Sequence, residues 1–181
     1  AISSFSSALT SLTLNLSPSP YAAYEIMFWL LGSLADKNLN NVLLVTPIAI
    51  LGWVIILLSK KWFTALSLGE ETAQSMGLDL RFFRSKIIIG TALSIGSIVS
   101  ITGGIGFIGL VVPHLLRPLY NYNPEKLLLP SGIGGAILLL LADIFIRILD
   151  IKPELQIGVV TAIIGAPFFI YLIFYIKRIH S

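Results

Sequence analysis

The chain has 181 residues, of which 56% are hydrophobic and only 12% are charged, and its mean hydropathy is +0.92. A soluble domain carries about a quarter charged residues, so this composition excludes an ordinary soluble protein and predicts an integral membrane protein. The absence of cysteine excludes disulfides and thiolate metal sites, and two histidines are too few for a histidine metal cluster. The net charge of +3 belongs to loops, and no basic patch interleaved with aromatic residues predicts nucleic-acid binding.

The first part of the chain predicts two short helices. Residues 1–16 are rich in small residues, lack the basic start of a signal peptide, and look like the end of a membrane helix whose beginning is missing. We therefore expect the chain to be a fragment. After a break at residues 17–20, residues 21–31 are aromatic-rich and too short to cross about 30 Å of hydrocarbon, so we expect an interfacial helix at the outer face. A polar turn is expected at 32–41.

Later stretches predict membrane crossings at 42–59, 87–102, 127–149 and 155–176, and a short broken crossing at 107–120. The second of these is rich in glycine and serine, which suits close contact between helices. Pro113 and Pro118 are expected to break the short crossing. Gly158, Gly165 and Pro167 are expected to interrupt the last one. Polar loops are expected at 121–126 and 150–154.

The basic residues lie unequally at the two ends of these crossings. If each stretch crosses once, nine basic residues share one face and three lie on or near the other. This inequality predicts that the first face and the C-terminus are cytoplasmic. The larger group is Lys60, Lys61, Arg81, Arg84, Lys86, Arg117, Lys126, Lys177 and Arg178, and the smaller group is Lys37, Arg147 and Lys152.

The longest polar interval, LSLGEETAQSMGLDLRFFRSK at residues 66–86, separates the first two complete crossings. It contains a helix-compatible piece at 65–76, with Glu70 and Glu71 near its start, and a shorter piece after Gly77. Gly77 stands where a glycine that ends a helix is expected. Two short helices on a basic membrane face predict a docking surface. A solvated connector is equally supported by composition, because charge runs usually face solvent.

Other polar features have a structural and a functional interpretation. The GGIG run at 103–106 lacks the lysine and hydroxyl residue of a phosphate-binding loop, which favours a turn or a close helix contact. Asp143 and Arg147 are four residues apart, which favours an ion pair over an Arg147 offered to an acidic partner. His114 has no second titratable group to form a proton relay, which favours packing. No nucleophile, base and orienting group occur together, so the sequence predicts neither an enzyme nor a cofactor.

Four motifs follow one another along the chain: LGE through MGL at 68–78, GGIGFIGLVVPHLLRPL at 103–119, LLPSG…LLLLADIFIR at 128–147, and ELQIGVVTAIIGAPFFIYL at 154–172. In order and spacing they resemble the FecCD-type permease family, the membrane subunits of type II ABC importers for ferric siderophores, haem and cobalamin. The resemblance covers nearly the whole chain from Tyr21 onward. It implies an all-α polytopic transmembrane helical bundle, the C-terminal half of a ten-helix permease, in which residues 1–16 end the fifth helix.

The resemblance also implies sites and partners. The interval 65–84 matches the family's cytoplasmic coupling helices, which dock on a separate ATP-binding subunit, and Arg147 matches a periplasmic arginine that meets an acidic residue of the substrate-binding protein. A second permease copy, a periplasmic or lipoprotein binding protein and the bacterial inner membrane are implied as well, with iron(III)-siderophore as the default substrate. The implied ATPase-coupling residues are Leu68, Gly69, Glu70, Ala73, Met76 and Gly77.

Two alternatives remain open from the sequence. An ion-coupled secondary transporter is also helical and broken by glycine and proline, but it requires buried carboxylates near the bilayer midplane, for which Asp143 is the only candidate. A non-functional remnant of a permease is the second alternative, because the translocation path needs the missing half.

Overall fold

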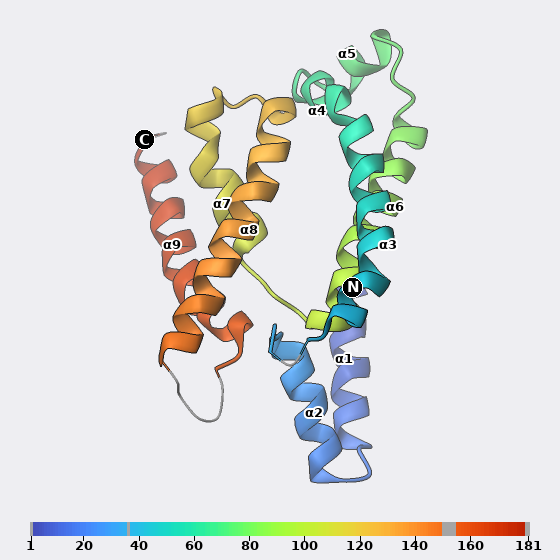
Figure 1. Ribbon diagram of the computed structural model, residues 1–181. Coiled ribbons are helices and arrows are strands. Elements are labelled where there is room, and N and C mark those ends of the chain that lie inside the picture. The colour runs from blue at the N-terminus through green and yellow to red at the C-terminus, as the bar shows by residue number, and fades with distance from the viewer. Residues whose placement is uncertain (1, 36, 150–154, 180–181) are drawn as a thin grey trace.

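The computed structural model describes residues 2–35, 37–149 and 155–179, and side chains within 4–171 of these (Figure 1). All regular structure in this part of the chain is helical, which confirms the predicted all-α fold. The loop expected at 150–154 lies outside the described residues. The helices are α1 (Ile2–Asn15), α2 (Pro20–Leu31), α3 (Leu39–Leu58), α4 (Lys60–Ser67), α5 (Glu70–Ser75), α6 (Leu80–Thr102), α7 (Ile108–Leu116), the 3-10 helix η1 (Arg117–Tyr120), α8 (Pro124–Leu149) and α9 (Ile157–Ile179).

Three described helices, α3, α6 and α8, are long and apolar enough to cross a membrane by length and composition. Large apolar side chains are exposed on all of them, because these helices are apolar all round rather than along one stripe. α7 has only 9 residues and gives way to η1 at Arg117. The expected break is confirmed beside Pro118, where the helix type changes. The break expected at Pro113 is wrong, because Pro113 lies inside α7. α9 is apolar over its described side chains.

The long helices form two groups (Figure 1). α3 and α6 lie side by side along their lengths, and α7, α8 and α9 form the second group. Small residues allow the first pair to approach closely: a Cβ on Gly52 would lie 2.7 Å from the backbone nitrogen of Ser94, and a Cβ on Gly90 would lie 3.1 Å from the carbonyl oxygen of Gly52. The expected role of glycine and serine in this contact is therefore confirmed.

A junction of backbones joins α2, the 103–106 turn and the start of α9. Gly103 has a φ of 71°, and a Cβ there would collide with the carbonyl oxygen of Trp29 at the end of α2. A Cβ on Gly158 in α9 would collide with the carbonyl oxygen of Leu31. The GGIG run is thus a turn in close helix contact, as favoured from the sequence.

α9 runs as one helix through Pro167, so the expected interruption of this crossing is wrong. Proline removes one backbone donor, and membrane helices tolerate this loss when neighbouring groups compensate. Gly165 has a packing role instead, because a Cβ there would collide with the Cβ of Phe107.

The helices of the polar interval at 66–86 differ from the predicted ones in two places. The single helix expected at 65–76 is wrong, because α4 ends at Ser67 and α5 begins at Glu70. Gly69 lies between them with a φ of 110°, a conformation that no helix can contain. The shorter piece after Gly77 is not a separate helix but the first turns of α6. α8 likewise begins inside the loop expected at 121–126.

Candidate functional site

The docking segment, defined here as residues 60–86, consists of α4, α5 and the first turns of α6. It projects from one end of the bundle, where α8 begins and α9 ends (Figure 1). The chain enters it abruptly, since Ser59 both ends α3 and precedes α4. The buried Ser59 hydroxyl donates a hydrogen bond of 3.0 Å to the carbonyl oxygen of Ile55, which closes the last turn of α3.

A small hydrophobic core holds the docking segment together. Its buried members are Ala65 of α4, Ala73 of α5, Phe83 of α6, and Leu78 from the link between α5 and α6. The Phe83 ring meets the ring of Phe63 edge to face, with centroids 5.4 Å apart. Because this core packs α4 and α5 onto the first turns of α6, it fixes the shape of the docking segment next to the membrane-length part of α6.

Capping fixes the start of α6 within the same segment. The Asp79 carboxylate accepts hydrogen bonds from the backbone nitrogens of Arg81 at 2.9 Å and Phe82 at 3.1 Å. An aspartate in this position satisfies donors that the helix leaves free and interacts favourably with the helix dipole. Lys86 lies 4.4 Å from the Phe82 ring centroid, a cation–π contact on the outer side of the helix.

The predicted coupling residues divide between the surface and the core. Leu68 and Met76 are 64% and 60% exposed, and Gly69 and Gly77 are also exposed. Ala73 is fully buried, so it supports this surface from beneath and offers no atom to a partner. An exposed apolar side chain and a glycine with positive φ thus stand at each end of α5: Leu68 and Gly69 before it, and Met76 and Gly77 after it.

Glu70 belongs to this surface and forms an ion pair that was not predicted. Its Oε1 accepts a hydrogen bond of 2.7 Å from Arg84, and both side chains are mostly exposed. The pair joins the start of α5 to α6. The two residues are 14 apart in sequence, so no helical spacing could have paired them.

Arg147 lies far from the docking segment, in the last turn of α8 at the opposite end of the bundle (Figure 1). Its Nε donates a hydrogen bond of 2.8 Å to the Asp143 carboxylate, which confirms the ion pair favoured from the sequence. The Arg147 side chain is mostly exposed, whereas Asp143 is mostly covered. The pair therefore leaves the guanidinium accessible at the helix end.

Comparisons with known proteins match nearly all of the chain to one family. The sequence profile of the FecCD transport family matches residues 1–175. The Fe(3+)-citrate import system permease protein YfmD of Bacillus subtilis (strain 168) is 34% identical over 172 residues, which are 95% of this chain and 51% of that protein. The vitamin B12 import system permease protein BtuC of Salmonella newport (strain SL254) is 40% identical over 151 residues, 82% of this chain and 45% of that protein.

The fold is also similar to a solved structure. It is described as an inward-facing conformation of an ABC transporter assigned to the metal-chelate type, and it matches with a TM-score of 0.86 and 34% identity. The match covers 93% of this chain and 55% of that one. The chain thus spans about half the length of the relatives that it matches.

Proposed function

The chain belongs to the FecCD transport family, and we propose from this that it is the C-terminal half of the transmembrane permease of an ABC importer. The observation that carries the proposal is the agreement of the family match with the docking segment, a compact element with its own core that projects from a bundle of membrane-length helices. Its partners would be a separate ATP-binding subunit, a substrate-binding protein and a second permease copy.

In this proposal the docking segment receives the ATP-binding subunit. Leu68 and Met76 supply exposed apolar contacts, and Gly69 and Gly77 shape the backbone beside them. Glu70, fixed by Arg84, supplies a charge in a defined position. Ala73 keeps α5 seated on the core beneath. Buried apolar anchors surrounded by polar contacts are typical of protein interfaces, and this surface offers both kinds of group.

The opposite end of the bundle would face the substrate-binding protein. Arg147 is accessible there, and a guanidinium binds carboxylates through paired hydrogen bonds. Asp143 holds the arginine at 2.8 Å and so limits the positions that it samples before docking. The excess of basic residues at the docking-segment end supports a cytoplasmic location for that end and for the C-terminus of a bacterial inner-membrane protein.

The mechanism follows from this placement. ATP binding would close the dimer of ATP-binding subunits, and the docking segments would follow that closure. Two permease copies would then alternate between outward-open and inward-open arrangements, with the substrate passing between them. The permease would contribute the path and the coupling, and the ATP-binding subunit would contribute hydrolysis.

We propose an iron(III)-chelate as the substrate, with haem and cobalamin as the other classes. One relative is named for Fe(3+)-citrate and another for vitamin B12, and both molecules are metal chelates. The test is uptake of radioactive iron-siderophore by proteoliposomes that contain the permease, its ATP-binding subunit and its binding protein. ATP-dependent iron uptake that excess cobalamin does not inhibit is expected. Uptake driven by an ion gradient without ATP would refute the importer.

A further inference from the structure

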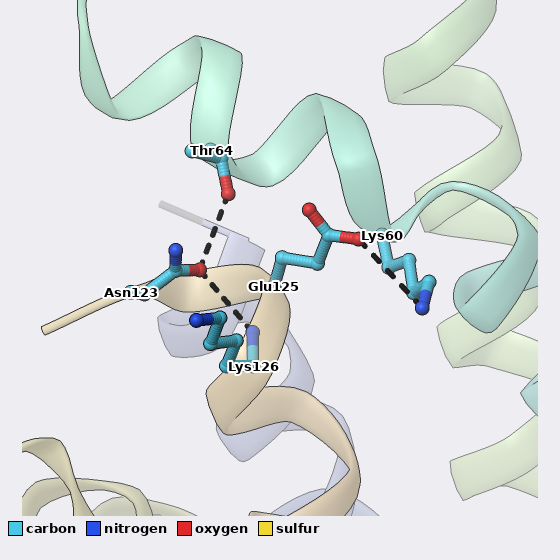
Figure 2. Close-up of polar contacts among 5 residues, drawn as sticks. All are labelled: Lys60, Thr64, Asn123, Glu125 and Lys126. Atoms are coloured by element: carbon cyan, nitrogen blue, oxygen red, sulfur yellow. Dashed lines mark hydrogen bonds and ion pairs between the residues drawn. The ribbon is translucent and has the colours of Figure 1, made fainter. Parts of the chain in front are cut away.

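Two polar contacts join the docking segment to α8 (Figure 2). The Thr64 hydroxyl of α4 donates a hydrogen bond of 3.4 Å to the side-chain oxygen of Asn123. The same oxygen accepts a hydrogen bond of 3.2 Å from the backbone nitrogen of Lys126, in the first turn of α8. Asn123 therefore caps α8 and holds α4 with one atom.

The second contact lies one helical turn earlier on α4. The Lys60 ammonium is 3.6 Å from the Glu125 carboxylate of α8 (Figure 2). Lys60 and Thr64 are four residues apart, so both contacts lie on one face of α4. We call these two contacts the α4–α8 clamp.

The turn before α8 is built to present Asn123 to α4. Asn121 and Tyr122 have φ values of 50° and 56°; asparagine adopts this left-handed conformation readily, whereas tyrosine adopts it rarely and at a cost. The backbone nitrogen of Tyr122 bonds to the carbonyl oxygen of Arg117 at 3.0 Å, and that of Asn123 bonds to Tyr120 at 3.0 Å. A strained turn that is held by its own hydrogen bonds fixes the position of the cap.

α8 continues without interruption from the clamp to the other end of the bundle. Its 26 residues carry Glu125 in the first turn and Arg147 in the last. At about 1.5 Å per residue the helix is roughly 40 Å long. α8 stays one continuous helix through Pro130, so a movement of α4 that the clamp passes to its start has a direct route to the end that bears Arg147.

We infer that the α4–α8 clamp stays closed through the transport cycle and that α8 is the helix that carries movement of the docking segment to the Arg147 end. Asn123 is its positioning residue. The inference rests on the proposed function, since it requires an ATP-binding subunit at the docking segment and a binding protein at the other end.

Paired variants test whether the clamp transmits movement. Thr64→Val and Asn123→Ala remove the hydrogen bond, and Thr64→Ser and Asn123→Asp keep it. In proteoliposomes with the ATP-binding subunit and the binding protein, the first pair is expected to lower binding-protein-stimulated ATP hydrolysis by roughly 5- to 10-fold, the size of a typical coupling between sites. Co-purification of the ATP-binding subunit is expected to stay unchanged, and the second pair to behave as the parent does.

A crosslink separates transmission from folding. The chain contains no cysteine, so Thr64→Cys combined with Asn123→Cys introduces the only two thiols in it. With free thiols the Thr64–Asn123 contact of the clamp is lost while the Lys60–Glu125 contact remains, and a short bis-methanethiosulfonate reagent restores the lost contact covalently. The crosslinked protein is expected to take up substrate at a rate within about 2-fold of the parent, as for a coupling of this size. Reducing the crosslink is expected to return uptake to the rate of the uncrosslinked variant.

The outcomes distinguish this inference from the function on which it rests. If Thr64→Val and Asn123→Ala keep full stimulation, the clamp is only a structural contact and the inference is wrong. If the crosslink stops uptake, the clamp must open during transport and the inference is again wrong. If the ATP-binding subunit fails to co-purify with the parent itself, the proposed function is wrong and the inference falls with it.

Discussion

Removing the Phe83 ring is expected to destabilise the docking segment and make it open more often, while leaving the membrane helices intact. Phe83 is 6% exposed and packs edge to face on Phe63 in a core of four buried residues. Truncation of a buried phenylalanine to alanine costs about 3 to 5 kcal/mol, and this small core can partly collapse, so we take about 3 kcal/mol for Phe83→Ala. At about 1.4 kcal/mol per tenfold change, the open population of the segment rises roughly 100-fold.

Limited digestion with trypsin measures this opening. Arg81 and Arg84 lie in the first turns of α6, inside the segment, and cleavage follows the open population when reclosing is fast. Phe82→Ala is the matched control, because Phe82 is the neighbouring residue and is 61% exposed. We expect cleavage to rise roughly 100-fold in Phe83→Ala and less than about 5-fold in the control, which loses one cation–π contact. Equal cleavage rates in the two variants would refute the reasoning.

Three further predictions concern the surface and the junction. Glu70→Arg is expected to reduce co-purification of the ATP-binding subunit. Its effect on the free energy of unfolding is expected to stay below about 1 kcal/mol, because the Glu70–Arg84 ion pair is exposed. An equal loss of co-purification in Glu71→Arg would contradict a specific role for Glu70. Arg147→Glu is expected to weaken binding-protein capture about tenfold or more in a pull-down, as loss of a charged hydrogen-bonding pair does, and unchanged capture would contradict it. Gly158→Ala is expected to lower the melting temperature in detergent, since its Cβ meets the Leu31 carbonyl, whereas Gly109→Ala, with nothing within 4 Å, is not.

The sequence predicted the helical membrane fold because long apolar runs carry that information locally. The same reliance on apolar runs predicted a crossing that starts at residue 87, whereas α6 begins at Leu80. Arg81, Arg84 and Lys86 end the apolar run, yet the helix extends through them to its first residue, Leu80, and hydropathy cannot tell a membrane span from its extension into water. The break at Gly69 was also missed, although the Glu-Glu pair that follows is typical of a helix start.

The contacts that organise the candidate site could not be predicted from local pattern. Thr64 and Asn123 are 59 residues apart, and their contact depends on how α4 and α8 pack. The burial of Ala73 depends on Phe83, which belongs to another helix. A motif can therefore name the residues of a docking surface, but only the packed structure separates those that face a partner from those that support the surface.

The backbone junction at Gly103 and Gly158 has a consequence for genetic variation in this protein. Both positions place a carbonyl oxygen of α2 where any Cβ would stand. Any amino-acid replacement there introduces a Cβ, and no choice of side chain avoids the collision. In a saturation screen for transport these codons should therefore accept silent changes alone, while the exposed apolar positions of α3 and α8 exchange freely among leucine, isoleucine and valine.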